Sequence, residues 1–367
     1  MTIAANTWSF YPEYETDFAN YLHEILLRLA NQQPQHRFIL FCNEGFRYTD
    51  EYSANSERIY LANCTKHTLV NHAKFLWKLK GEIKKNSPDI LFQNGIINRF
   101  KGIQHFIIPS NPGFITDNKN QIIRNKKYYK NYAHKKAEFI VPTNPHKEAL
   151  VNELSLSHKI INVVPPGTPV LHSDHLSPEL TRKQYAEGCD YFICAGENSN
   201  PGHFTKILQA FTLFKKRLKS NMKFILYTSN QSVNASLKEL LSNYTLKDEV
   251  KIVETNSQKH LLTLIMSSYA YIGGGSSSDF GSGLIAAMYL GTLVIAEDRK
   301  VNKEYCGDAA LYFDMQDQKG LSEKMMLVYK DEAYRKTLIS KGKAQGSIFT
   351  WEASISRVWN LVEAKSA

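Results

Sequence analysis

The sequence lacks any long uninterrupted apolar run. A membrane-spanning helix needs about 18 or more consecutive apolar residues, and no stretch approaches that length. The first residues, MTIAANTWSF, also lack the basic start, the long apolar segment and the small-residue cleavage site of a secretory signal. We therefore expect a soluble protein that works in the cytoplasm.

Cysteine is scarce and shows no metal-binding spacing. The chain has 5 cysteines, at Cys42, Cys64, Cys189, Cys194 and Cys306, and none of them forms a C-x-x-C pair. An odd number without that spacing indicates reduced thiols and excludes a disulfide framework or a zinc site. We predict small buried cysteines, no metal and no cofactor.

The nucleotide-binding P-loop is absent, because no Gly-Lys-Ser or Gly-Lys-Thr follows the glycine-rich loops. Residues 281–286, GSGLIA, fit the G-x-G-x-x-A pattern of dinucleotide binding, with Glu297 placed to accept a ribose hydroxyl. That pattern normally follows its strand directly, whereas a loop from Gly273 to Phe280 intervenes here. A nicotinamide-dependent enzyme is an alternative that rests on this match alone.

Acidic residues are outnumbered, 35 against 45 basic residues, which gives a formal net charge of +10 and favours anionic partners. Much of the excess lies in residues 74–85 and 119–136. The cations of the second segment do not gather on one helical face, so we predict no nucleic-acid partner. We interpret both segments as solvated helices, and contact of the first domain with an anionic membrane surface is the alternative.

Apolar strand-like runs alternate with helix-like stretches along the whole chain, which indicates an α/β fold with parallel sheets. The expected strands are residues 2–6, 37–43, 89–95, 105–110, 137–143, 159–167, 190–196, 223–229, 250–255, 269–275 and 292–298. Helices are expected at 17–31, after residue 201, where Ile207, Leu208, Phe211, Phe214 and Leu218 share one face, and at 350–364.

Length predicts two domains, because 367 residues exceed one ordinary hydrophobic core. The proline-rich segment 165–180 has neither helical nor strand periodicity and is the expected linker. We therefore expect domains at 1–170 and 171–349, followed by a helix at 350–367 that packs back toward the first domain.

The stretch Gly273–Gly291, GGGSSSDFGSGLIAAMYLG, joins a small-residue loop to an apolar helix expected to begin near Gly283. The first turn of a helix has unpaired N–H groups and a partial positive charge, so a phosphate can bind there without a lysine. Gly281 and Gly283 would allow the ligand to approach the backbone closely. A loop that merely caps a buried helix is the alternative.

Several segments resemble family-four glycosyltransferases, which are retaining enzymes of the GT-B fold. The resemblance rests on four segments of the chain. Three lie in its second half: residues 191–217 (YFICAGENSNPGHFTKILQAFTLFKKR), residues 276–314 (SSSDFGSGLIAAMYLGTLVIAEDRKVNKEYCGDAALYFD), which include Glu304, and residues 349–363 (FTWEASISRVWNLVE). The fourth is the N-terminal segment, residues 1–41 (MTIAANTWSFYPEYETDFANYLHEILLRLANQQPQHRFILF). It implies two Rossmann-like domains that face each other across a cleft, the first for the acceptor and the second for a nucleotide-sugar donor. The acceptor would be a glycan, a lipid-linked molecule or a protein.

Charged residues of this family's donor site are replaced in the chain. Two family glutamates correspond to Ser278 and Ala286, and an Arg-Lys pair corresponds to Pro201 and Gly202. In the first domain, family glycines correspond to Asp17 and Ala19, and a His-Asp pair corresponds to Ser110 and Asn111. Losing one preorganised partner of a developing charge costs about 100- to 1000-fold in rate.

The resemblance nevertheless implies a candidate site. Asp279, His203 and Lys206 are the candidate catalytic residues, and the donor-binding residues would be Gly196, Glu197, Asn198, Ser278, Gly281, Ser282, Gly283 and Leu284. We favour a hexosyltransferase-type, retaining glycosyltransferase. A catalytically inactive glycosyltransferase-like protein, acting as binding or regulatory partner of an active glycosyltransferase, is the alternative.

Overall fold

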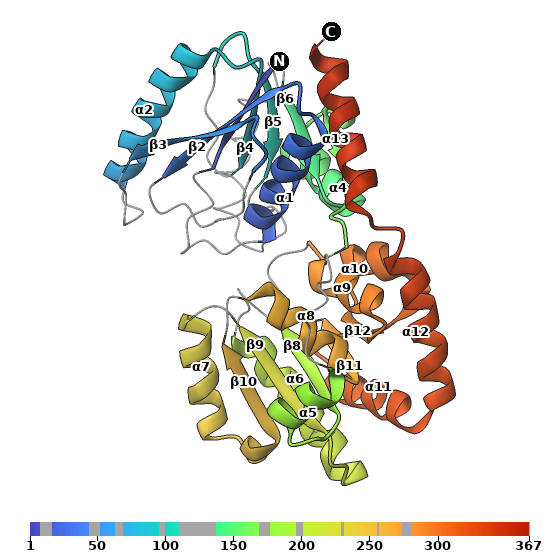
Figure 1. Cartoon of the computed structure of the whole chain (residues 1–367). Coiled ribbons are helices and arrows are strands. Elements are labelled where there is room, and N and C mark those ends of the chain that lie inside the picture. Colours follow the sequence, from blue (N-terminus) through green and yellow to red (C-terminus); the bar gives the residue numbers. More distant parts are fainter. Residues whose placement is uncertain are drawn as a thin grey trace. The chain divides into compact units, whose positions relative to one another are not determined.

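The chain forms two compact α/β units. The computed structural model describes residues 1–7, 17–43, 52–62, 69–94, 100–109, 137–168, 177–195, 201–228, 231–254, 257–273 and 280–366. One unit comprises Met1–Pro166 together with Trp351–Ala367, and the other comprises Gly167–Thr350 (Figure 1). The two parallel sheets that these units contain confirm the predicted α/β fold.

The first unit is built on a sheet of parallel strands. Its members are β1 (Thr2–Asn6), β2 (Arg37–Asn43), β3 (Ser56–Ala62), β4 (Ile90–Asn94), β5 (Gln104–Ile108), β6 (Ala137–Val141) and β7 (Ile161–Val163). They pair in the order β3-β2-β1-β4-β5-β6-β7, and every pairing is parallel. Strand β5 is buried along its whole length, as expected for a parallel sheet covered on both faces.

The first unit also contains helices α1 (Asp17–Gln32), α2 (Leu69–Asn86), α4 (Asn144–Leu154) and α13 (Trp351–Ser366). Helix α2 buries Phe75, Leu79 and Ile83 in a core shared with β1, β2 and β4. These three residues are four apart, so they share one face of the helix. The opposite face of α2 is left to solvent.

The C-terminal helix α13 packs beside α1, as Figure 1 shows. The ring of Trp351 lies 6.1 Å from that of Tyr21, and the Ser354 hydroxyl donates to the Pro165 carbonyl at 2.6 Å. At the far end, the Lys365 ammonium lies 2.7 Å from the carboxylate of Glu138, which is buried in β6 and also accepts from Asn162 at 2.9 Å. The last helix is therefore held at both ends.

The second unit has its own parallel sheet. Its strands are β8 (Tyr191–Ala195), β9 (Lys223–Thr228), β10 (Val250–Glu254), β11 (Ala270–Gly273), β12 (Leu293–Glu297) and β13 (Ala310–Phe313). They pair in the order β10-β9-β8-β11-β12-β13. The chain thus runs outward from β8 in one direction and outward from β11 in the other.

Helices cover both faces of this sheet. They are α5 (Pro178–Ala186), α6 (Pro201–Leu218), α7 (Gln231–Ser242), α8 (Gln258–Ser267), α9 (Ser282–Leu290), α10 (Lys300–Cys306), α11 (Gln318–Lys330) and α12 (Glu332–Gly346). Helices α6, α7 and α11 share one core with the sheet, whereas α8, α9 and α10 share another. Nowhere in the described ranges is a helix both long and apolar enough to cross a bilayer.

The expected linker 165–180 is partly wrong, because α5 begins at Pro178, within it. The Ser177 hydroxyl caps this helix by accepting from the Leu180 N–H at 3.3 Å. Proline in the first turn and a serine before it are standard helix-start signals. Those signals were present in the sequence, although residues 169–176 lie outside the described residues.

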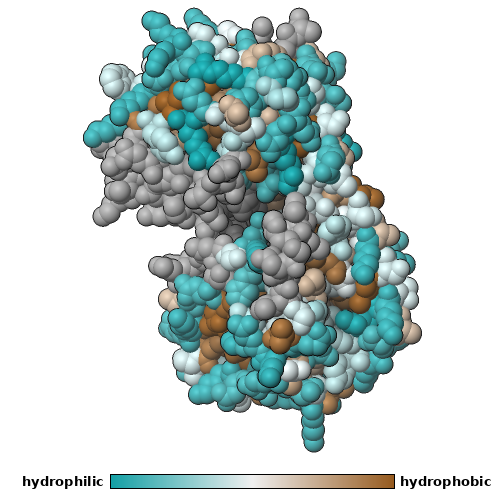
Figure 2. Space-filling model, in the orientation of Figure 1, coloured by the Kyte–Doolittle hydropathy of each residue, from teal (hydrophilic) through white to brown (hydrophobic). Residues whose placement is uncertain are grey.

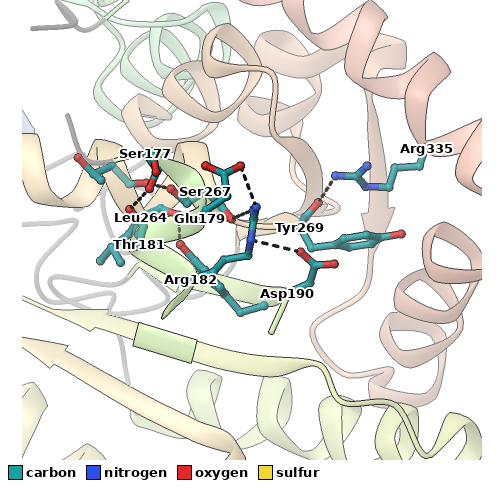
Figure 3. A network of polar contacts seen from close by, with 11 residues as sticks. Ser177, Glu179, Thr181, Arg182, Asp190, Leu264, Ser267, Tyr269 and Arg335 are labelled. Carbon is teal, nitrogen blue, oxygen red and sulfur yellow. Dashed lines mark hydrogen bonds and ion pairs between the residues drawn. The ribbon is translucent and has the colours of Figure 1, made fainter. Parts of the chain in front are cut away.

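A polar network holds the amino-terminal ends of β8 and β11 (Figure 3). Asp190, directly before β8, lies 3.9 Å from Arg182 of α5, and that guanidinium also donates to the Ser267 carbonyl at 3.4 Å. Directly before β11, the Tyr269 carbonyl accepts from Arg335 at 3.2 Å, and the guanidinium lies 4.0 Å from the centre of the Tyr269 ring. This edge of the sheet is thus structural.

We expect Lys365→Ala to lower the free energy of unfolding of the first unit by about 1–2 kcal/mol, because the buried Glu138 carboxylate loses its ammonium partner. All 4 tryptophans of the chain belong to this unit, so tryptophan fluorescence during urea unfolding reports on it. Arg357→Ala removes an equal charge from an exposed position of the same helix and is the control. Equal midpoints for the two variants would show that the ion pair adds no stability.

Candidate functional site

The order of strands in the second sheet locates the candidate site. Strands β8 and β11 are neighbours and parallel, with Ala270 opposite Phe192 and Tyr271 opposite Ile193. The order of strands reverses between them, and ligands of open α/β sheets bind beyond the carboxyl ends of strands at such a switch point. Helix α6 begins after β8, and α9 begins after β11, so both helices start at this edge.

The N-cap residue of helix α9 is a glycine, which has no side chain to cap the first turn. Gly281 is its N-cap residue, in the left-handed region with φ 65° and ψ 12°, and its carbonyl accepts from the Ile285 N–H at 2.9 Å. Ser282 is exposed, Gly283 is half-buried and Leu284 is buried. A glycine N-cap offers no side-chain oxygen to the first-turn N–H groups, which suits an incoming anion.

The glycines at this helix start are required by packing. A Cβ at Gly281 would overlap the ring of Tyr305, and a Cβ at Gly283 would overlap the hydroxyl of Tyr271. Tyr271 and Tyr305 are buried in the core cluster that includes Leu284. From the sequence we interpreted both glycines as allowing close approach of a ligand, whereas the structure gives them a role on the core side of the backbone.

Helix α6 carries two of the candidate catalytic residues in its first two turns. His203 is half-buried, and its Nδ1 atom is buried without a hydrogen-bond partner among the described residues. The Lys206 ammonium donates to the side-chain oxygen of Gln316 at 2.6 Å. Because Gln316 is neutral, Lys206 is oriented by this contact but its charge is not cancelled.

Gln316 is a contact that we did not foresee from the sequence. It follows β13, and the Asp314 carboxylate accepts from its backbone N–H at 2.8 Å. Because β13 is parallel to β12, Gln316 lies beyond the same carboxyl edge from which α6 and α9 begin. A polar residue just after a strand of a parallel sheet was the available signal.

The other predicted site residues lie outside the described residues. These are Gly196, Glu197, Asn198, Ser278 and Asp279. Ser110 and Asn111 of the first domain are outside them as well, whereas Ala286 is buried within α9. In the described part of the chain, no three histidine, cysteine or acidic side chains gather as metal ligands would.

The alternative that residues 281–286 bind a dinucleotide does not agree well with the positions of β11 and α9. Strand β11 ends at Gly273 and α9 begins at Ser282, so GSGLIA starts eight residues beyond the strand. In the dinucleotide fold the first glycine forms the tight turn directly after its strand. Gly281 instead occupies the N-cap position of the helix.

Comparison with known proteins agrees with these features of the second unit. Residues 181–345, less than half of the chain, match the family model described as "Glycosyl transferases group 1". None of the proteins with curated descriptions matches the chain in sequence. The matched segment runs from α5 to α12 and includes both helix starts described above.

Solved structures match the chain over nearly its full length. Sucrose-phosphate synthase from Thermosynechococcus elongatus is 16% identical at a TM-score of 0.75, covering 99% of this chain and 98% of that one. Anabaena HepE in complex with UDP-glucose is 14% identical at a TM-score of 0.76, covering 99% and 100%. WaaG, a glycosyltransferase involved in lipopolysaccharide biosynthesis, is 11% identical at 0.71, covering 94% and 95%. The predicted GT-B fold is thereby confirmed.

We expect Gly283→Ala to lower the free energy of unfolding of the second unit by about 1–3 kcal/mol, because the new methyl group would overlap Tyr271. Tyr271→Phe removes the overlapping oxygen. The double variant should therefore be more stable than the sum of the two single losses predicts, as a double-mutant cycle followed by calorimetry would measure.

Gly81→Ala is the matched control for this cycle, because Gly81 is also helical but has open space around it. It should be neutral or stabilising by about 0.5–1 kcal/mol. If the losses of Gly283→Ala and Tyr271→Phe were simply additive, the close contact would not be what requires a glycine.

Proposed function

We propose that the protein is a glycosyltransferase that transfers a sugar from a nucleotide-sugar donor to a glycan, lipid-linked or protein acceptor. The observation that carries the proposal is the switch point: the two predicted donor segments follow β8 and β11, the adjacent parallel strands at which the sheet order reverses. The match of residues 181–345 to group 1 glycosyl transferases supports sugar transfer by this unit.

In the proposed reaction, the anomeric carbon of the donor sugar loses its bond to the diphosphate oxygen and forms a bond to an acceptor hydroxyl oxygen. The hydroxyl proton passes to the leaving nucleoside diphosphate, which gains negative charge as its bond to the sugar breaks. The first-turn N–H groups of Gly283 and Leu284 would bind that pyrophosphate at the positive end of α9. Lys206 would supply a positive charge, and His203, in the first turn of the same helix, would supply a second polar group near the leaving group. These interactions stabilise charge that develops in the transition state.

We further propose a retaining reaction of the family-four type, with Asp279 beside the donor sugar and Gly196, Glu197, Asn198 and Ser278 lining the donor. The first unit, with α13, would provide the acceptor side, and the second unit would provide the donor side. The position of the predicted donor residues within the second unit supports the donor part of this division.

An inactive partner of an active glycosyltransferase is the second candidate. It is favoured by the replacements at Pro201, Gly202, Ser278 and Ala286, which remove charged groups that the resemblance places in the donor site. Backbone N–H groups can bind a phosphate without accelerating its departure. Nucleotide binding without turnover is therefore the property that separates this candidate from the enzyme.

The test begins with calorimetric melting of the protein in UDP, GDP, UDP-glucose and NAD. A ligand that binds only the folded state raises the melting temperature, and we expect a nucleoside diphosphate to do so. Release of the nucleoside diphosphate from a nucleotide sugar would then support an active glycosyltransferase. Binding of the nucleotide sugar without this release would support the inactive partner. Stabilisation by NAD alone would contradict both.

Where turnover is found, we expect Lys206→Ala to lower it by about 100- to 1000-fold, because the leaving diphosphate loses a preorganised positive charge. Lys216→Ala removes an equal charge from an exposed position in the last turn of the same helix and should leave turnover unchanged. Similar activity of the two variants would exclude Lys206 from the reaction. Initial rates of diphosphate release provide the measurement.

A further inference from the structure

Trp77 is the most exposed of the large apolar side chains in the described residues. Its exposed fraction is 77%, compared with 62% for Ile348, the next in rank. Trp77 lies on α2, two residues from Phe75 and two from Leu79, both of which are buried. Since each residue turns the helix by about 100°, Trp77 points directly away from the core that holds the helix in place.

Lysines surround this tryptophan. Lys74, Lys78, Lys80, Lys84 and Lys85 are all exposed, and we call these residues with Trp77 the α2 basic face. Glu82 is the single acidic residue in the sequence of this helix, and it lies 3.7 Å from Lys85. Teal and pale colours accordingly prevail over α2 in the space-filling view (Figure 2).

The stability of helix α2 explains the presence of only some of these residues. Lys84 and Lys85 lie in the last turn, where positive charge favourably opposes the helix dipole. Lys74, Lys78 and Lys80 lie before the last turn, and Trp77 buries little surface within its own unit. The combination of an exposed indole with lysines on both sides therefore points to an external partner.

We propose that the α2 basic face docks on an anionic membrane surface. The indole of Trp77 would enter the headgroup region, which tryptophan favours because its ring is apolar and its N–H is polar. The lysines would lie against anionic headgroups, each adding to the attraction. This proposal concerns binding to a bilayer and does not depend on whether the protein transfers sugars.

Charge and shape favour a bilayer over the other occupants of such a face. In a symmetric contact with a second copy of the chain, two sets of lysines would oppose each other. Single-stranded nucleic acid binds to successive aromatic side chains along a groove. Among the side chains of α2 that the structure describes, residues 73–86, Trp77 is the only exposed aromatic one. A flat anionic surface needs neither a groove nor a second aromatic.

The test is co-sedimentation of the full chain with vesicles. Vesicles of phosphatidylcholine containing about a third phosphatidylserine should bind the protein, and pure phosphatidylcholine should not. Binding should weaken as salt is raised. The chain has 4 tryptophans, so a variant is needed to assign any change in emission to Trp77. A blue shift on vesicle binding that is lost in Trp77→Ala would place this indole in the bilayer.

Two matched pairs of variants test the face itself. Lys80→Gln with Lys84→Gln should weaken binding by about 25-fold, or about fivefold for each lysine. Lys336→Gln with Lys341→Gln removes the same charge from exposed positions of α12 and should have little effect. Trp77→Ala should also weaken binding, whereas Ile348→Ala, an exposed apolar position in the second unit, should not.

The proposal would be overturned by equal binding to neutral and anionic vesicles, by equal losses in the α2 and α12 variants, or by binding of single-stranded nucleic acid in place of vesicles. Loss of self-association in Trp77→Ala, measured by analytical ultracentrifugation in the absence of vesicles, would assign the face to a second copy instead. Because Trp77 and the lysines are exposed, their variants should retain the unfolding midpoint of the parent protein.

Discussion

The position of α9 depends on two tyrosines that pack against its backbone. Tyr271 comes from β11, on the amino-terminal side of the helix in sequence, and Tyr305 comes from α10, on the carboxyl-terminal side. Both contacts require glycine, at Gly283 and Gly281, because a methyl group would not fit. The core thereby sets where the first turn begins, so a phosphate at this turn would meet N–H groups that are oriented in advance.

The two edges of the second sheet differ in what lies beside them. At the amino edge, Arg182 and Arg335 hold the chain where it enters β8 and β11. At the carboxyl edge, the same two strands lead to the starts of α6 and α9. Functional residues on loops need a rigid scaffold beneath them, and here the polar contacts that provide the rigidity lie at the opposite end of the strands.

Much of the fold could be predicted, because periodicity and turn residues are local signals. Strands 2–6 and 37–43 agree with β1 and β2 to the residue, and the start of α5 was missed although Ser177 and Pro178 marked it. The candidate site was less predictable for a physical reason. The contact of Tyr305 with Gly281 joins residues that are apart in sequence, and Lys206 and Gln316, which are hydrogen-bonded, are separated by 110 residues of the chain. Such pairs depend on tertiary packing, about which sequence periodicity gives no information.

The same limit explains why net charge alone could not tell the two proposed partners apart, although the basic segment 74–85 already suggested membrane contact as an alternative. Lys206 contributes one charge to the formal +10, yet its contact with Gln316 orients it at the carboxyl edge of the second sheet, where we propose that a diphosphate binds. The lysines of α2 contribute more to the total, but they lie on an exposed face around Trp77. A charge that is oriented by a neutral partner suits a small anion at close range, whereas exposed charges on flexible stems suit a broad anionic surface. Burial and contacts therefore separate the two proposed anionic partners, which composition alone does not distinguish.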